Sequence, residues 1–586
     1  MLSRSLWSVA MVGMLCSGLA QAAGDQPMAR GWIVKLKDAQ PQPVVRLAAA
    51  AVPSDGPTSQ RNRLWQAAQR QRVSIVAHRP SAFGAQVIRA ASTMTLAQAE
   101  AEADRLRGDP DVEWVVVNAV ERRAATANVL PVTDPAYGSQ TWLAPRVSGL
   151  AGVGNFPAAW QAVAVPRATS QVAVAVLDTG ILSEPDELDG RILQGYDFIS
   201  ESVYARDGNG RDADPSDEGD WMDDATRQSN PLLYADNCEN EDSSWHGTAI
   251  AAMLVASVNN GQYGTGMLAA FPDVKVLPVR VGGVCGADRA DILDAMLWAA
   301  GIPFSGSPPV NQNPAKVISL SFGGGDTCSV NTGYPRVIEQ LRNAGVLLVA
   351  SAGNGDDSGR GLSTPTVPAN CQGVMAVTAL NQRGSKATYA NLVRTGDGLW
   401  GIGVAGGDVN TSSFATDDGV QTLVDTGSRE PSGTFAMSPI AGTSFATPQV
   451  AGVAAMLWSL DSSLSLNQVM SILVNSARPW AQVNAELSSL FLPLCSTSQR
   501  GACRCTDSTC GSGVLDAAAA VGAVLDESSL FRQELSNDPD PVTNESGGGG
   551  GGGHIGWPWG LALYALLLSG WWSQRRRAQN LQAVKV

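Results

Sequence analysis

The stretch Gln171-Val172-Ala173-Val174-Ala175-Val176-Leu177, with Asp178 directly after it, is the part of the sequence that decides the fold. An apolar run of this length, without polar alternation, is typical of a strand buried on both faces of a parallel sheet. Similar runs, each predicted to be a strand, follow at residues 274–281, 316–322, 346–351 and 374–380. Helices are predicted between some of them, at residues 288–299 and 335–343. This alternation predicts an α/β fold, with a doubly wound, mostly parallel sheet and helices on both faces.

Three separate motifs carry side chains suited to catalysis. Asp178 stands at the carboxyl end of a predicted strand, where sites in such sheets lie. His246 is one of only three histidines in 586 residues, and Ser444 precedes an apolar stretch that indicates a helix. A nucleophilic serine needs a base to take its proton and an acid that orients the base. A turn aspartate, a core histidine and an N-cap serine would explain each motif alone but not all three, so we predict a serine peptidase.

The composition indicates a globular, exported protein. With 586 residues the chain has room for more than one domain, and 44% hydrophobic residues can form a large core. The formal net charge is -14. Such a chain lacks the excess of Lys and Arg that displaces counterions from nucleic acids, so we expect no nucleic-acid partner.

The N-terminus is typical of a signal peptide. Arg4 precedes a largely apolar stretch from Leu6 to Ala20, and Ala20-Gln21-Ala22 offers the small residues that signal peptidase requires. We therefore expect signal peptidase to remove residues 1–22. Cys16 is not expected to carry a lipid, because Leu15 stands before it where a lipobox has a small residue.

Export changes the interpretation of the cysteines. Those that remain after the signal peptide stand at positions 238, 285, 328, 371, 495, 503, 505 and 510. An even number in an oxidising compartment predicts disulfides, and the cluster at residues 495–510 has no nearby histidine that would indicate zinc. The sequence leaves the pairing open. Cys238 with Cys285, and Cys328 with Cys371, would each join loops beside the predicted active site.

Residues 23–127 have a different pattern. Strands are predicted at residues 31–36, 84–89 and 112–117, and helices at residues 61–72 and 96–106. We interpret the pattern as a β-α-β-β-α-β order, which makes a small α+β, ferredoxin-like domain. Its function is either substrate binding or inhibition as a propeptide. We favour the propeptide, because a basic, Ala-rich stretch at residues 122–128 provides a linker that can be cut.

Three stretches in the order Asp, His, Ser resemble the subtilisin family of serine peptidases. They are Val174-Ala175-Val176-Leu177-Asp178-Thr179-Gly180, Ser244-Trp245-His246-Gly247-Thr248 and Gly442-Thr443-Ser444-Phe445-Ala446-Thr447-Pro448. The resemblance implies that Ser444 is the nucleophile, His246 the general base and then acid, and Asp178 the carboxylate that orients the histidine. We expect the peptidase domain at residues 128–525, and residues 23–127 are similar to the inhibitor-type propeptides of the same family.

The sequence departs from the family at two places near these motifs. Ala249 stands where the family usually has a second histidine, and Val404-Ala405-Gly406-Gly407 replaces a common Ala-Pro-Gly turn. Neither departure removes a reacting group. Both concern local packing only.

The resemblance also implies residues that bind the reacting peptide. Asn354 matches the asparagine that donates its amide to the oxyanion, and the backbone amide of Ser444 is the second donor. Other matched positions are the edge that pairs with an extended substrate, at Ser321, Phe322 and Gly323, and the primary specificity pocket, at Ala352, Gly353 and Thr366. No acidic residue is assigned to the pocket floor. We therefore expect protein or peptide substrates with apolar or uncharged side chains at the cleaved position.

Residues 207–220 hold the densest run of oxygen ligands in the chain. Calcium takes six to eight oxygens, and Asp and Asn residues in a glycine-bearing loop can wrap one ion. Because calcium-stabilised loops are frequent in subtilisin-like enzymes, we expect a structural calcium ion held by Asp207, Asp212, Asp214 and Asp217. The spacing is not that of an EF-hand, and the alternative is a solvated acidic loop. No cofactor is expected for catalysis.

The C-terminus indicates a sorting signal. Residues 526–553 are a polar linker that ends in glycines 547–553, and residues 554–586 contain an apolar stretch followed by Arg575-Arg576-Arg577. The apolar stretch can just span a bilayer as a short transmembrane tail. Together these features resemble the GlyGly-CTERM signals that rhomboid-like proteases cut. The alternative is permanent anchoring; we favour transient inner-membrane attachment before the protein becomes secreted or cell-surface bound.

Three functions fit the whole chain. The favoured one is a secreted, monomeric serine endopeptidase that is made as a self-inhibited precursor. A dedicated processing peptidase or peptide ligase on the same fold is the alternative. An inactive, tethered binding protein is the third, and the intact set of Asp178, His246, Asn354 and Ser444 argues against it.

Overall fold

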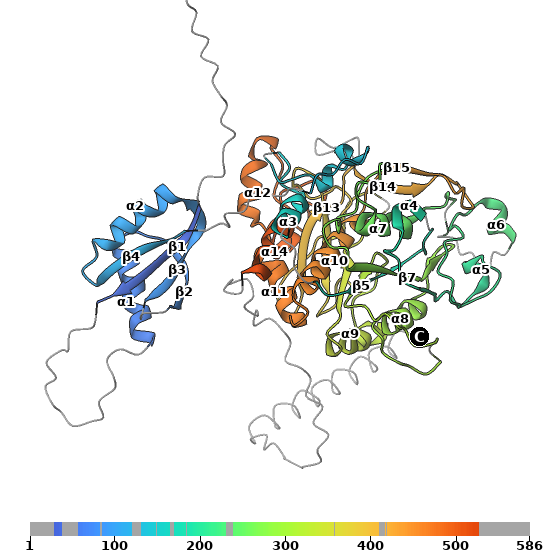
Figure 1. Cartoon of the computed structure of the whole chain (residues 1–586), viewed down its shortest axis with the longest axis horizontal. Helices are drawn as coiled ribbons and strands as arrows, with labels where there is room; N and C mark the ends of the chain where they lie inside the picture. Colours follow the sequence, from blue (N-terminus) through green and yellow to red (C-terminus); the bar gives the residue numbers. More distant parts are fainter. Residues whose placement is uncertain are drawn as a thin grey trace, which may run out of the picture. The chain divides into compact units, whose positions relative to one another are not determined.

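The structure is a computed structural model (Figure 1). It describes residues 28–37, 57–81, 85–119 and 130–526, the last range with gaps at residues 148, 164–168, 183–184, 230–237, 239, 307, 357, 410–416 and 418. The predicted signal peptide, the linker at residues 122–128 and the sorting tail lie outside the described residues. No helix within the described part is long and apolar enough to cross a membrane. The chain divides into two compact units, residues 1–126 and 127–586.

The N-terminal unit has the predicted β-α-β-β-α-β order. Its elements are β1 (Met28–Leu36), α1 (Pro57–Arg70), β2 (Ile75–Pro80), β3 (Gln86–Thr95), α2 (Leu96–Arg107) and β4 (Val112–Ala119). The strands form one antiparallel sheet in the order β2-β3-β1-β4. No strand was predicted at the residues of β2, although the order inferred from the sequence requires one there.

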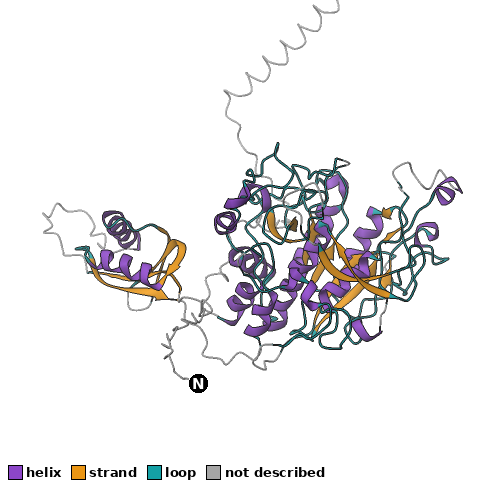
Figure 2. Ribbon diagram, turned by 90° about the horizontal axis from the view of Figure 1, so that it is seen from above, coloured by secondary structure: helices purple, strands orange, loops and turns teal. Residues whose placement is uncertain are grey.

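Both helices of the N-terminal unit lie on the same side of its sheet (Figure 2). Trp32 of β1 is fully buried, and its indole Nε1 donates a hydrogen bond of 2.8 Å to the carbonyl of Ala99 in α2. Helix α2 begins at a capping box formed by Thr95 and Gln98. Successive strand residues point to opposite faces of the sheet, so Ile33 of β1 lies on the face opposite Trp32. It is paired with Val116 of β4, which is 51% exposed. The sheet therefore has one face covered by helices and one face without helices, on which Ile33 and Val116 lie beside Lys35 and Arg89.

The larger unit is built on a seven-stranded sheet in the order β13-β12-β11-β10-β5-β7-β6, with every neighbouring pair parallel. The strands are β5 (Val172–Asp178), β6 (Tyr196–Asp197), β7 (Val274–Arg280), β10 (Val317–Leu320), β11 (Leu347–Ser351), β12 (Met375–Leu380) and β13 (Trp400–Ala405). Five of these were predicted, and β6 and β13 were not. Two antiparallel hairpins complete the strands, β8 (Gly282–Gly283) with β9 (Gly286–Ala287) and β14 (Val420–Asp425) with β15 (Phe435–Ile440).

The central strand β5 shows why the sheet needs helices on both faces. Val172, Val174 and Val176 belong to one buried cluster, while Ala173, Ala175 and Leu177 belong to another. The first cluster includes α3 (Phe156–Ala162), α7 (His246–Val255), α10 (Thr443–Leu460), α11 (Leu466–Ser476) and α14 (Ala517–Leu525). The second includes α8 (Arg289–Ala299) and α9 (Tyr334–Asn343). The predicted doubly wound α/β fold is confirmed.

Shorter elements lie in the connections of the larger unit. The helices are α4 (Pro185–Leu188), α5 (Ser202–Ala205), α6 (Asp224–Ser229), α12 (Trp480–Glu486) and α13 (Asp507–Cys510). Single 3-10 turns occur at Tyr137–Ser139, Thr141–Leu143, Val330–Thr332 and Ser488–Leu490.

Four disulfides join the eight cysteines of the larger unit. They are Cys238–Cys285, Cys328–Cys371, Cys495–Cys503 and Cys505–Cys510. The sulfur atoms of Cys495, Cys505 and Cys510 approach one another closely enough to suggest a metal site. Each of them is already bonded to another sulfur, so the prediction of disulfides in place of zinc is confirmed.

Candidate active site

The fold gathers the three predicted catalytic side chains from distant parts of the larger unit. Asp178 is the last residue of β5, His246 is the first residue of α7, and Ser444 is the second residue of α10. His246 Nδ1 lies 2.7 Å from Asp178 Oδ1, a hydrogen-bond distance. Phe445, the residue after Ser444, places its ring 5.0 Å from the imidazole, centroid to centroid. The starts of α7 and α10 therefore meet at the end of β5.

The surroundings of the pair make His246 more basic than an ordinary histidine. The Asp178 side chain is 2% exposed, while that of His246 is 21% exposed. Desolvation lowers the pKa of His246, but the charge and hydrogen bond of Asp178 act against it. Smaller contributions from the charges of Asp220 and Asp217 act in the same direction as Asp178. The net effect raises the pKa of His246 above its ordinary value of 6.5.

Asn354 follows β11 and is oriented by the residue before Ser444. Its Oδ1 accepts hydrogen bonds from the backbone amide and the hydroxyl of Thr443, at 2.9 and 2.8 Å. The Thr443 hydroxyl also accepts the amide of Gly353 at 3.1 Å. Because both donors hold the amide oxygen, the Asn354 Nδ2 group is left for another acceptor, which is the orientation that oxyanion binding needs. Thr443 was not predicted as a site residue, since its role depends on these contacts.

The residues predicted to bind the substrate come together beside Ser444. The Ser321 hydroxyl donates to the carbonyl of Ser444 at 3.3 Å, and the Phe322 ring packs so closely on Gly282 that a side chain there would collide with it. At Gly323, an added Cβ would lie 2.5 Å from the hydroxyl of Thr366.

The three residues predicted to line the specificity pocket lie together. Thr366 donates its backbone amide to the carbonyl of Ala352 at 3.0 Å, and Gly353 has a φ of +96°. Asn391, which was not predicted, holds this turn: its Nδ2 donates to Ala352 at 2.8 Å and its amide to Gly353 at 3.0 Å. A Cβ on Gly353 would lie 2.6 Å from that Nδ2, so only glycine fits.

The four carboxylates predicted to bind calcium do not form one site. Asp217 is buried and accepts the Thr179 hydroxyl at 2.6 Å, whereas Asp214 accepts Ser216 in an exposed turn. Asp212 accepts the side-chain Nδ2 of Asn209 at 2.9 Å, and Asp207 lies 3.4 Å from the guanidinium of Arg280. Within the described residues, the only side-chain group spaced for a metal ion is the disulfide-bonded cysteine cluster.

A cation of the chain itself explains part of this difference. The buried Arg280 donates to Asp197 at 2.6 Å and to the carbonyl of Ala205, and it approaches Asp207. A guanidinium with these partners supplies positive charge beside Asp207, one of the four predicted ligands. The four predicted residues therefore do not fit one calcium ion.

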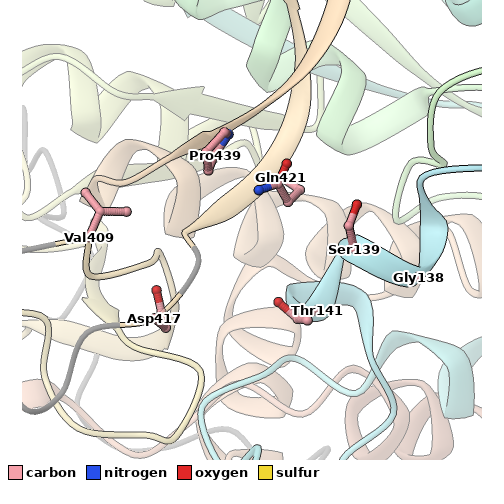
Figure 3. A pocket seen from close by; sticks show the side chains of 7 residues that line it. All are labelled: Gly138, Ser139, Thr141, Val409, Asp417, Gln421 and Pro439. Atoms are coloured by element: carbon pink, nitrogen blue, oxygen red, sulfur yellow. The ribbon is translucent and has the colours of Figure 1, made fainter. Parts of the chain in front are cut away.

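A cavity of about 570 Å³ lies elsewhere in the larger unit and contains no predicted site residue. Figure 3 shows it between Ser139 and Thr141 on one side and Gln421 and Pro439 of the β14–β15 hairpin on the other. Asp417 also lines it, but its Oδ1 accepts the backbone amides of Asp408 and Gly419. This cavity therefore holds none of the predicted catalytic residues.

Comparison with known proteins also points to the subtilases and to proteases. The model of the subtilase family matches residues 169–513. An extracellular protease of Xanthomonas campestris pv. campestris is 36% identical over 446 residues, 76% of this chain and 65% of that protein. An extracellular basic protease of Dichelobacter nodosus is 33% identical over 475 residues, 80% of this chain and 66% of that protein. The chain thus spans slightly less than two thirds of the length of these relatives.

A solved structure is also similar. A protease from Pseudoalteromonas arctica PAMC 21717 matches with a TM-score of 0.53 and 36% identity, over 67% of this chain and 99% of that chain. The family model covers more than half of the sequence, and it spans the ends of β5, α7, β11 and α10 where the site lies. The chain therefore belongs to the subtilase family.

Proposed function

We propose that this protein is a secreted serine endopeptidase, made as a precursor that its own N-terminal unit inhibits. The observation that carries the proposal is the 2.7 Å bond between Asp178 and His246 at the place where α10 presents Ser444. The relatives from Xanthomonas and Dichelobacter are named extracellular proteases, which supports both the reaction and the export.

In the proposed reaction Ser444 Oγ attacks the carbonyl carbon of the peptide bond while His246 Nε2 takes the hydroxyl proton. Asp178 holds the Nδ1–H of the imidazole, which fixes the tautomer and stabilises the imidazolium. The oxyanion accepts hydrogen bonds from Asn354 Nδ2 and the amide of Ser444. His246 then protonates the leaving amine, and water hydrolyses the acyl-enzyme by the same steps in reverse. No cofactor takes part.

The residues beside Ser444 favour a broad substrate range. Gly323, Ala352, Gly353 and Thr366 offer no charged side chain to the bound residue. Pairing of an extended substrate with the backbone near Gly323 would give affinity without strong selection of side chains. We therefore propose protein and peptide substrates with apolar or uncharged residues at the cleaved position.

The N-terminal unit is suited to inhibition by docking. Its helix-free face carries the exposed Val116 and the partly exposed Ile33 and Trp114, flanked by Lys35 and Arg89. Apolar side chains rimmed by polar ones are typical of an interaction surface. We propose that this unit covers the enzyme until the linker at residues 122–128 is cut. We further propose that glycines 547–553 are cut by a rhomboid-like protease, which releases a monomer. A structural calcium ion stays a prediction that needs other ligands, and a lower thermal midpoint in EDTA would support it.

The test is the intact mass of the expressed protein before and after treatment with a fluorophosphonate, which reacts with activated serines. We expect one label at Ser444, an N-terminus near residue 128 and a C-terminus within residues 547–553. The Ser444→Ala and His246→Ala chains are the matched controls, and both should remain unlabelled and uncut at the linker. A labelled, processed Ser444→Ala chain would overturn the assignment, and a released protein that retains residues 554–586 would overturn the sorting proposal.

A further inference from the structure

Besides the bond between Asp178 and His246, a hydroxyl group connects the turn after β5 to the start of α7. Thr179 Oγ1 accepts the amide of Gly247, the second residue of α7, at 3.0 Å. Trp245, at the N-cap position, has a φ of 48° and makes no capping bond with its side chain. The Thr179 hydroxyl therefore satisfies one of the amides that the start of the helix leaves open.

The direction of this hydroxyl is set by a buried carboxylate. Asp217 is 1% exposed; its Oδ2 accepts the Thr179 hydroxyl at 2.6 Å and its Oδ1 accepts the amide of Gly219 at 2.9 Å. A hydroxyl has one proton, so a hydroxyl that donates to Asp217 turns its lone pairs toward Gly247. Backbone contacts hold the two segments together, since Ile181 donates to Pro215 at 3.0 Å.

Thr179 also orients the side chain of the catalytic aspartate. Its backbone amide donates to Asp178 Oδ1 at 2.8 Å, and within the described part of the chain the buried Oδ2 of Asp178 has no hydrogen-bond partner. Apart from His246, the Thr179 amide is thus the group that holds this carboxylate. The position of Thr179 therefore affects both members of the pair. Its backbone amide holds Asp178, and its hydroxyl holds the start of α7, which carries His246.

We propose that Asp217 is a positioning residue of the triad, which acts through the hydroxyl of Thr179. This inference rests on the proposed peptidase function and deepens it. Asp217 does not touch the substrate or the reacting atoms. It holds the turn after β5 against the helix that carries His246, so that the imidazole and Asp178 keep their alignment during proton transfer.

The contacts at neighbouring glycines support this role. A Cβ on Gly247 would lie 2.0 Å from the carbonyl of Gly180, and a Cβ on Gly180 would lie 2.7 Å from the carbonyl of Pro215. The turn after β5 is therefore in direct contact with α7 on one side and the Asp217 loop on the other. Displacement of the turn by about 1 Å is enough to cost catalysis about a hundredfold.

The test uses the full-length chain and measures kcat per active site, titrated with the fluorophosphonate, and KM for a small peptide anilide. Asp217→Ala and Thr179→Val should each lower kcat about 10- to 100-fold with KM unchanged. Thr179→Ser keeps the hydroxyl and should therefore have the kcat of the wild-type enzyme. The double variant should be no slower than either single variant, because both remove the same connection. Glu218→Gln, which removes a charge from the adjacent, partly exposed residue, is the matched control and should leave both kcat and KM unchanged.

The outcomes separate this inference from the proposed function. If the wild-type chain is neither labelled nor active, the proposed function fails and the inference fails with it. If the wild-type chain is active but Thr179→Val or Asp217→Ala retains its kcat per titrated site, positioning by Asp217 is overturned. Additive losses in the double variant would also overturn it. If Asp217→Ala does not mature, the pair Thr179→Val and Thr179→Ser decides the question.

Discussion

The two units of the molecule use their sheets in opposite ways. The antiparallel sheet of the N-terminal unit is covered on one face, and residues such as Val116 remain exposed on the other. The parallel sheet of the larger unit is covered on both faces, and all seven residues of β5 are buried. Parallel strands need crossover connections, so distant segments return to the same edge of the sheet. The first arrangement suits a part that docks and is removed, and the second suits a part that holds side chains in fixed places.

The largest expected difference between the units is catalytic. Asn354→Ala, in the larger unit, should lower kcat about 10²- to 10³-fold, or about 2.7–4 kcal/mol, which is the magnitude measured by mutagenesis of this donor in subtilisin itself. Asn118→Ala, in β4 of the N-terminal unit, should leave kcat of the processed enzyme unchanged, because the proposed mature enzyme no longer contains β4. Steady-state kinetics on active-site-titrated enzyme checks both. An equal loss in the two variants would contradict the division of roles.

A smaller difference is expected in stability. Leu177 of β5 is fully buried, so Leu177→Ala should destabilise the larger unit by about 2–5 kcal/mol through the lost contacts and the remaining cavity. Val116→Ala, at an exposed position, should change the stability of the N-terminal unit by no more than about 0.5 kcal/mol. Hydrogen exchange in the Ser444→Ala chain, which should retain both units, measures each unit separately. A large loss from Val116→Ala would mean that its face is already covered.

The smallest expected effect concerns pH. Desolvation lowers the pKa of His246, but the charge and hydrogen bond of Asp178, together with the charges of Asp220 and Asp217, outweigh it and raise the pKa. The proposed base works only when it is neutral, so activity should fall as the pH drops through this raised value. The acid limb of kcat/KM should have its midpoint above 6.5, the ordinary pKa of histidine, in a profile recorded with the processed enzyme. A midpoint at or below that ordinary value would mean that desolvation outweighs the carboxylate.

The strands were predictable where most of their residues are apolar, as in β5 and β11. The edge strands were not, because β6 has only two residues and β13 alternates glycine with larger side chains. Short motifs likewise predicted the positions of Asp178, His246 and Ser444. They carry enough local information because each combines a strand end or helix start with a reactive side chain.

The supporting residues could not be read from the sequence. Thr443, Asn391 and Thr179 are ordinary polar residues whose roles come from partners that only the fold brings near. The acidic loop gave a misleading signal for the same reason. Its density of oxygen ligands suggested a bound cation, but Arg280, far along the chain from the loop, forms ion pairs with Asp207 and Asp197.

The placement of the disulfides has a consequence for the lifetime of the two parts. All four bridges lie between residues 238 and 510, whereas residues 23–127 contain no cysteine. A bridge limits how far a chain can open, and opened chain is what proteases digest. In the proposed precursor mechanism, we therefore expect the unbridged piece to be digested before the bridged one once the linker is cut. Digestion of the inhibitor would then make activation irreversible.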